Sequence, residues 1–108
     1  LGQLDEAIAV WRNVHREDNP EAYAAAQNNL GSAYEDKELF EDSFAARSRV
    51  LRSDSPYIYA VAQLNMGIAY YDNGSLDEAV TAWNRVLEED DLQSYAEAQR
   101  SLALVNKH

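Results

Sequence analysis

The chain has 108 residues, of which 46% are hydrophobic and 26% charged, so it carries enough apolar side chains for a packed core. Nineteen acidic residues against nine Lys and Arg give a net charge of −10, which argues against a nucleic-acid partner because phosphate binding needs clustered cations. The absence of cysteine excludes disulfides and thiolate zinc sites. Neither a signal peptide nor a membrane-length apolar stretch is visible, so we expect no membrane partner and a cytoplasmic location.

Apolar residues recur at helical spacing in six segments, and no segment alternates as a strand would. In the fourth segment, Tyr59, Ala62 and Met66 follow three- and four-residue steps. Asn73-Gly74 then supplies a tight turn, and Ser75 with Glu78 has the spacing of a capping box. In chain order, we expect helices at about 3–16, 20–36, 39–52, 56–73, 75–89 and 93–107.

The sequence repeats with a period of 36 residues, and the chain length is three such periods. Each period holds a helix, a turn and a second helix, whose apolar stripes can only be covered by stacking neighbouring pairs. The sequence therefore predicts an all-α array of antiparallel helix pairs. Because it begins on Leu1, we also expect it to be a section of a longer protein. Matching columns include Tyr23, Tyr59 and Tyr95; Gln27, Gln63 and Gln99; Leu30, Met66 and Leu102; and Val14, Val50 and Val86.

Two places interrupt the regularity of the repeat. The turn Lys37-Glu38-Leu39 lacks the glycine of Asn73-Gly74-Ser75, so we expect a looser connection there. Arg47 stands in the column of Trp11 and Trp83. We favour an arginine whose stem lies over the core edge with its guanidinium in water. The alternative is a polar notch in which Arg47 meets tyrosine or acidic side chains.

Glycine inside a helix costs about 1 kcal/mol relative to alanine, so Gly31 and Gly67 need a structural reason. We expect the two helices of a unit to cross most closely at these positions, with Ser43 and Ala79 as the facing residues.

The run Asn65-Met66-Gly67-x-Ala69-Tyr70, followed by Gly74, Asp77-Glu78-Ala79 and Trp83, resembles the tetratricopeptide repeat. Its first half recurs at 29–34 and its second at 2–11, so the resemblance covers essentially the whole chain. The period of 36 residues differs from the family's commonest 34. The resemblance implies a right-handed superhelical α-solenoid that serves as a non-catalytic protein-interaction scaffold.

The resemblance also implies that the first helices line a concave groove for an extended or helical peptide. The apolar middle of this groove is the expected contact centre, and its acids Glu35, Asp36 and Asp72 favour a neutral or basic partner. The alternative is a wall within a longer solenoid that has no dedicated ligand. The groove positions are Asn28, Ser32 and Glu35 in one repeat; Val61, Leu64, Ile68, Tyr71 and Asp72 in the next; and Arg100 and Ala103 in the last.

Self-association is a competing hypothesis. The chain starts with a second helix and ends with a first helix, so we expect both ends to expose apolar faces that could stack head to tail. The residues expected on these faces are Leu4, Ile8, Trp11, Leu102 and Val105.

No arrangement of residues in the sequence points to catalysis, a cofactor or a metal. The two histidines, His15 and His108, form no pair, and no phosphate-binding loop or serine elbow is present. The acidic run 88–91 lacks the alternation of a calcium loop and is interpreted as a solvated helix end. The sequence leaves the identity of the partner open.

Overall fold

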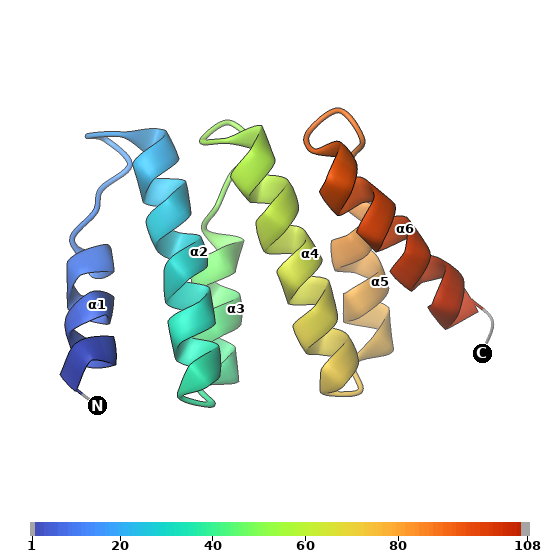
Figure 1. Cartoon of the computed structure of the whole chain (residues 1–108), viewed down its shortest axis with the longest axis horizontal. Helices are drawn as coiled ribbons and strands as arrows, with labels where there is room; N and C mark the ends of the chain where they lie inside the picture. Colours follow the sequence, from blue (N-terminus) through green and yellow to red (C-terminus); the bar gives the residue numbers. More distant parts are fainter. Residues whose placement is uncertain (1, 107–108) are drawn as a thin grey trace.

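The computed structural model describes residues 2–106, which form six helices and no strand (Figure 1). The described part measures about 42 × 30 × 18 Å. The helices are α1 (Gly2–Arg12), α2 (Pro20–Asp36), α3 (Phe40–Ser48), α4 (Pro56–Asp72), α5 (Leu76–Asn84) and α6 (Leu92–Asn106).

The helices form two layers. In Figure 1, α2, α4 and α6 lie side by side in front, and α3 and α5 lie behind them. The pairs α2–α3 and α4–α5 are antiparallel and make the most extensive contacts, while α1 packs on α2 at one end and α6 packs on α4 and α5 at the other. The predicted all-α solenoid of stacked helix pairs is confirmed.

The second helices of the repeats are shorter than the sequence predicts. α1, α3 and α5 end at Arg12, Ser48 and Asn84, not at 16, 52 and 89. The apolar pattern continued past the helix ends because Val50 and Val86 remain buried after the helix has stopped. Their amides donate to the carbonyl oxygens of Arg47 and Trp83, three residues earlier, at 3.2 and 3.1 Å. This three-residue spacing is tighter than the four-residue spacing of an α-helix, so the α-helix has ended there. The expected end of the last helix at 107 falls outside the described residues.

The first helices begin in the same way in every repeat. Asn19, Ser55 and Asp91 stand in one column of the repeat, and each accepts a hydrogen bond from the amide three residues later. Asn19 and Ser55 have extended backbones, with φ of −165° and −167°, which turns the side chain toward that amide. The donors are the amides of Ala22, Ile58 and Ser94, at 3.0, 3.2 and 3.0 Å.

The predicted capping box at Ser75 is wrong. Ser75 has φ −90° and ψ 75°, and its side chain makes no capping hydrogen bond. Its backbone amide instead donates to the Tyr70 carbonyl at 2.8 Å, as part of the turn that joins α4 to α5.

The turn at Lys37-Glu38-Leu39 is not looser than its counterpart, so this prediction is also wrong. The Leu39 amide donates to the Tyr34 carbonyl at 2.8 Å, the same bond at the same length as that from Ser75 to Tyr70. Glu38 takes φ 62°, close to the φ 81° of Gly74. The packed helix pair thus imposes one turn geometry on both connections, and Glu38 adopts a left-handed conformation that disfavours residues with a Cβ.

An arginine ties the first connecting loop to the next one. Arg16 donates from Nε to Asp54 Oδ1 at 2.8 Å and from Nη2 to Asp54 Oδ2 at 2.9 Å, a two-pronged charged contact. Nη2 also reaches the Arg49 carbonyl at 2.8 Å, and the guanidinium lies 4.5 Å from the centre of the Tyr23 ring. This contact holds the pKa of Asp54 below its ordinary value of 3.8.

The same tie recurs one repeat later. Arg52 donates from Nε to Asp90 Oδ2 at 2.7 Å and lies 4.8 Å from the centre of the Tyr59 ring. The acidic run 88–91 was predicted to be a solvated helix end; Glu88 and Glu89 are exposed, but the run is not the end of a helix. It forms the loop before α6, where the Asp90 side chain is almost buried against Arg52 and Asp91 caps the helix.

The conformation of Glu38 leads to a prediction of increased stability. Glu38→Gly should raise the free energy of unfolding by about 0.5–1 kcal/mol, because relief of the left-handed strain exceeds the added flexibility of the unfolded chain. Urea denaturation followed by circular dichroism measures the change. Gly74→Ala is the matched control and should lower stability by about 1 kcal/mol. A loss of stability in Glu38→Gly would contradict the assigned turn.

The paired state of Asp54 makes stability depend on pH. Because its pKa is lowered from 3.8 in the folded state, its contribution is present above pH 4 and is lost as the pH falls through the folded pKa. Asp54→Asn should therefore lower Tm at pH 7 and reduce the loss of Tm between pH 5 and pH 2, measured by thermal denaturation at each pH. The control Asp36→Asn, at an exposed carboxylate, should leave Tm at pH 7 near the parent value.

Candidate functional site

The apolar part of the predicted groove lies between α4 and α6. Ile68, Tyr71, Ser101 and Leu104 line a cavity of about 140 Å³, together with the largely buried indole of Trp83. Tyr71 also borders a second cavity of about 330 Å³, lined in addition by Gly74, Leu76 and Val105. Tyr71 therefore stands between two mainly apolar hollows.

Of the predicted groove residues, Ile68 and Tyr71 line these two cavities. Ser32, Asp72, Arg100 and Ala103 are exposed but do not line them. The remaining predicted positions with partial exposure are Asn28, Glu35 and Val61.

Leu64 was predicted as part of the contact centre, and this is wrong. It is buried in the core with Ala60, Trp83 and Leu102. α4 lies between α2 and α6, so a wider stripe of its surface is covered than on a helix at the edge of the array.

Sequence reasoning missed Leu104 and Ser101. Leu104 lies 36 residues after Ile68 and is its counterpart, whereas the groove position carried over for the last repeat was Ala103. Ala103 is instead the counterpart of Gly67. The 36-residue period applied to Ile68 points to Leu104, so this signal is present in the sequence.

The polar part of the groove rests on Arg47. Its side chain is only 2% exposed, and Nη2 lies 3.0 Å from Glu35 Oε1 and 3.0 Å from Ser32 Oγ. Nη1 lies 3.4 Å from Ser43 Oγ. The favoured interpretation, a guanidinium in water, is wrong, and the arginine occupies a buried polar notch with an acidic partner. Arg47 thereby fixes two groove residues, Ser32 and Glu35, from beneath.

The helical glycines face the bulky residue of the second helix, not Ser43 or Ala79 as predicted. A Cβ on Gly31 would lie 2.5 Å from Arg47 Nε and 2.6 Å from Arg47 Cγ. A Cβ on Gly67 would collide with the indole of Trp83. The glycines therefore make room for the large side chains that form the floor of the groove. The facing nitrogens, Arg47 Nε and Trp83 Nε1, are buried without a hydrogen-bond partner among the described residues.

The residues predicted to mediate self-association at the two ends mostly pack against other helices of the same chain. Ile8 is buried with Leu30 and Ala33 of α2, and Leu4 and Trp11 pack against the same cluster. Leu102 is buried, and Val105 packs against the core formed by α4, α5 and α6. The expectation that Ile8 and Leu102 are exposed on end faces is wrong, because each is covered by the neighbouring helix of this chain.

The described residues contain no group of three His, Asp or Glu side chains that could hold a metal ion. His15 is exposed in the loop after α1, and His108 lies outside the described residues. Within residues 2–106, no helix combines the length and apolar character needed to cross a membrane.

Helix pairs stacked at a fixed 36-residue period define an α-solenoid repeat protein. The family model for the tetratricopeptide repeat matches residues 1–58 and 64–106, and the chain belongs to this family. Comparisons with curated proteins and with solved structures give no match. Repeats of this family generally mediate protein–protein interaction and are typically non-catalytic.

The buried guanidinium of Arg47 makes Glu35 important for stability. Glu35→Gln should lower the free energy of unfolding by about 1–2 kcal/mol, because a buried cation loses its counter-charge. Chemical denaturation at neutral pH measures the loss. Asp36→Asn, which changes the next residue of the same helix, should stay within about 0.5 kcal/mol of the parent. Equal effects of the two substitutions would contradict the buried ion pair.

Proposed function

We propose that the chain binds a peptide segment of a partner protein along the surface of α2, α4 and α6. The observation that carries this proposal is the cluster of exposed apolar side chains Ile68, Tyr71 and Leu104, at 42%, 43% and 59% exposure. They surround a mainly apolar cavity on a chain of net charge −10. An apolar patch on an otherwise polar surface is typical of a contact site. An apolar side chain of the peptide would enter between Ile68 and Leu104.

The charge of the groove favours a neutral or basic peptide. Glu35 is already balanced by Arg47, so the exposed carboxylates that remain at the turn end are Asp36 and Asp72. Lysine or arginine in the peptide would pair with these two carboxylates, mainly by steering and orienting the partner. Head-to-tail stacking has less support, because Ile8 and Leu102 are covered within the chain.

Two short peptides test both the apolar anchor and the charge preference. The acetylated and amidated peptides KFKLK and EFELE are titrated into the ¹⁵N-labelled protein. We expect KFKLK to bind at least tenfold more tightly and to shift the amides of Ile68, Tyr71 and Leu104. Leu104→Ser should weaken binding by about tenfold, because it removes much of one apolar contact.

Leu92→Ser is the matched control, since Leu92 is a similarly exposed leucine on the same helix but outside the cavity. Its affinity should equal that of the parent. Equal affinities for the two peptides would contradict the charge preference. If neither peptide binds at millimolar concentration, the groove proposal itself is contradicted.

A further inference from the structure

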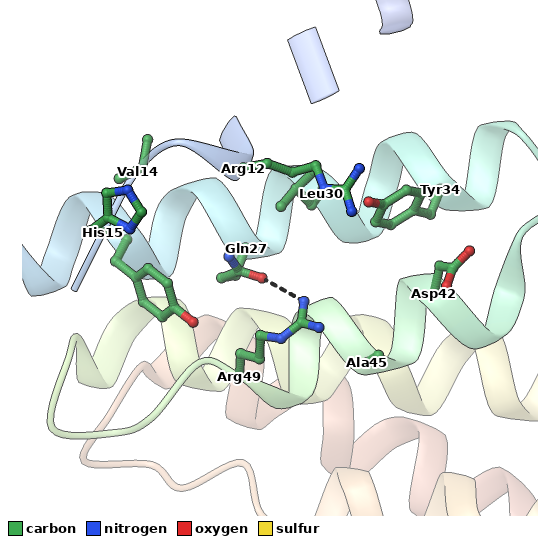
Figure 2. A pocket seen from close by; sticks show the side chains of 10 residues that line it. Arg12, Val14, His15, Gln27, Leu30, Tyr34, Asp42, Ala45 and Arg49 are labelled. Carbon is green, nitrogen blue, oxygen red and sulfur yellow. Dashed lines mark hydrogen bonds between the residues drawn. The ribbon is translucent and has the colours of Figure 1, made fainter. Parts of the chain in front are cut away.

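Figure 2 shows the lining of a polar cavity of about 330 Å³. This cavity lies on the other side of α2 from the groove. Its floor includes Gln27 and Leu30, whereas the groove residue Ser32 lies about 200° around the helix axis from Leu30. Arg12 at the end of α1 and Arg49 after α3 flank this floor. We name this hollow the outer cavity. The other lining residues are Val14, His15, Tyr23, Tyr34, Asp42 and Ala45.

The outer cavity gathers cations that have no acidic partner. Within residues 2–106, Arg16, Lys37, Arg47 and Arg52 each form an ion pair with an aspartate or glutamate. Of the four in this range that form none, Arg12 and Arg49 line the outer cavity, whereas Arg85 and Arg100 lie elsewhere.

One of these two arginines is held in place. Arg49 Nη1 donates to Gln27 Oε1 at 3.3 Å, which Figure 2 shows as a dashed line. Gln27 is only 5% exposed, so it anchors the guanidinium at the cavity wall. The remaining donors of Arg49, together with those of Arg12, are left for a ligand.

The next repeat contains an equivalent cavity with the opposite balance of charge. This counterpart cavity, of about 340 Å³, has Met66 and Tyr70 where the outer cavity has Leu30 and Tyr34. Arg85 replaces Arg49, but Ser48 stands in the column of Arg12. Two acids, Asp77 and Glu78, also line it, against the single Asp42 of the outer cavity.

The comparison between the two cavities has two consequences. The counterpart cavity lies between two complete helix pairs and is still open. The hollow therefore comes from the way in which the repeats stack. The difference in charge comes from side chains alone. The outer cavity is therefore a specific cationic position on a chain whose net charge is −10.

We propose that the outer cavity binds an aspartate or glutamate side chain in an acidic segment of a partner protein. Two guanidinium groups against one carboxylate leave a single positive charge, which matches a carboxylate and falls short of a doubly charged phosphate. Leu30, Tyr34 and Ala45 offer an apolar wall to the methylene groups of the bound side chain. The net charge of −10 disfavours such a segment on the chain as a whole, so a position with an excess of cations is where it would bind.

The site is independent of the peptide groove and can be tested separately. The acetylated and amidated peptides GEEEG and GQQQG are the probes, titrated at low salt into protein labelled with ¹⁵N, including the side chains of Gln27 and Arg49. We expect GEEEG to shift these two side-chain signals with saturation, and GQQQG to leave them unchanged. Arg49→Gln and Arg12→Gln should each weaken GEEEG binding at least fivefold.

The matched control is Arg85→Gln, which alters the equivalent arginine of the counterpart cavity and should leave GEEEG binding unchanged. Amide spectra show whether each variant is folded. If Arg49→Gln is not folded, Arg12→Gln decides the result.

Several results would overturn the proposal. These are equal responses to GEEEG and GQQQG, equal losses in Arg85→Gln and Arg49→Gln, or tighter binding of inorganic phosphate than of GEEEG. A dimer in sedimentation velocity that is abolished by Arg49→Gln would also overturn it, because the occupant would then be a second copy of this chain. Binding of KFKLK in the groove should be unaffected by Arg49→Gln, so failure of one site is distinguishable from failure of the other.

Discussion

The close approach of the two helices in each pair, at Gly31 and at Gly67, is the contact on which the remaining structure depends. A large side chain of the second helix lies directly against the glycine, and any Cβ there would overlap it. This contact sets the distance between the two layers of helices. It also brings Arg47 and Trp83 under the residues of the first helices, so that the same contact that packs the pair forms the floor of the groove.

The two large side chains give the two helix pairs different chemical surroundings. Trp83 supplies an apolar floor beneath Ile68 and Leu104. Arg47 brings a buried charge, which requires Glu35 as a partner and draws in Ser32. Ser32 and Glu35 stand in the columns of Ile68 and Tyr71, so three linked differences between the repeats place polar surroundings next to apolar ones.

Contacts between successive repeats rely on charged groups as well as on apolar packing. Arg16 and Arg52 each cross from one connecting loop to an aspartate of the next and lie over a tyrosine ring. The third position of this column is Glu88, which cannot donate such a contact. The cations that remain outside these pairs include Arg12 and Arg49, and both line the outer cavity, where they outnumber the single carboxylate of Asp42.

The number and order of the helices, their starts at Pro20 and Pro56, and the stacked-pair architecture could be predicted from the sequence. These features follow from apolar periodicity and from the 36-residue repeat, both of which are local or additive along the chain. Packing in the folded chain was needed to show that Leu64 is covered while Leu104 is not, that Arg47 is buried, and that Glu38 takes a left-handed conformation. Each of these features depends on which helix packs against the residue. Apolar periodicity predicts that a side chain faces inward, but it does not identify the residues that the side chain contacts.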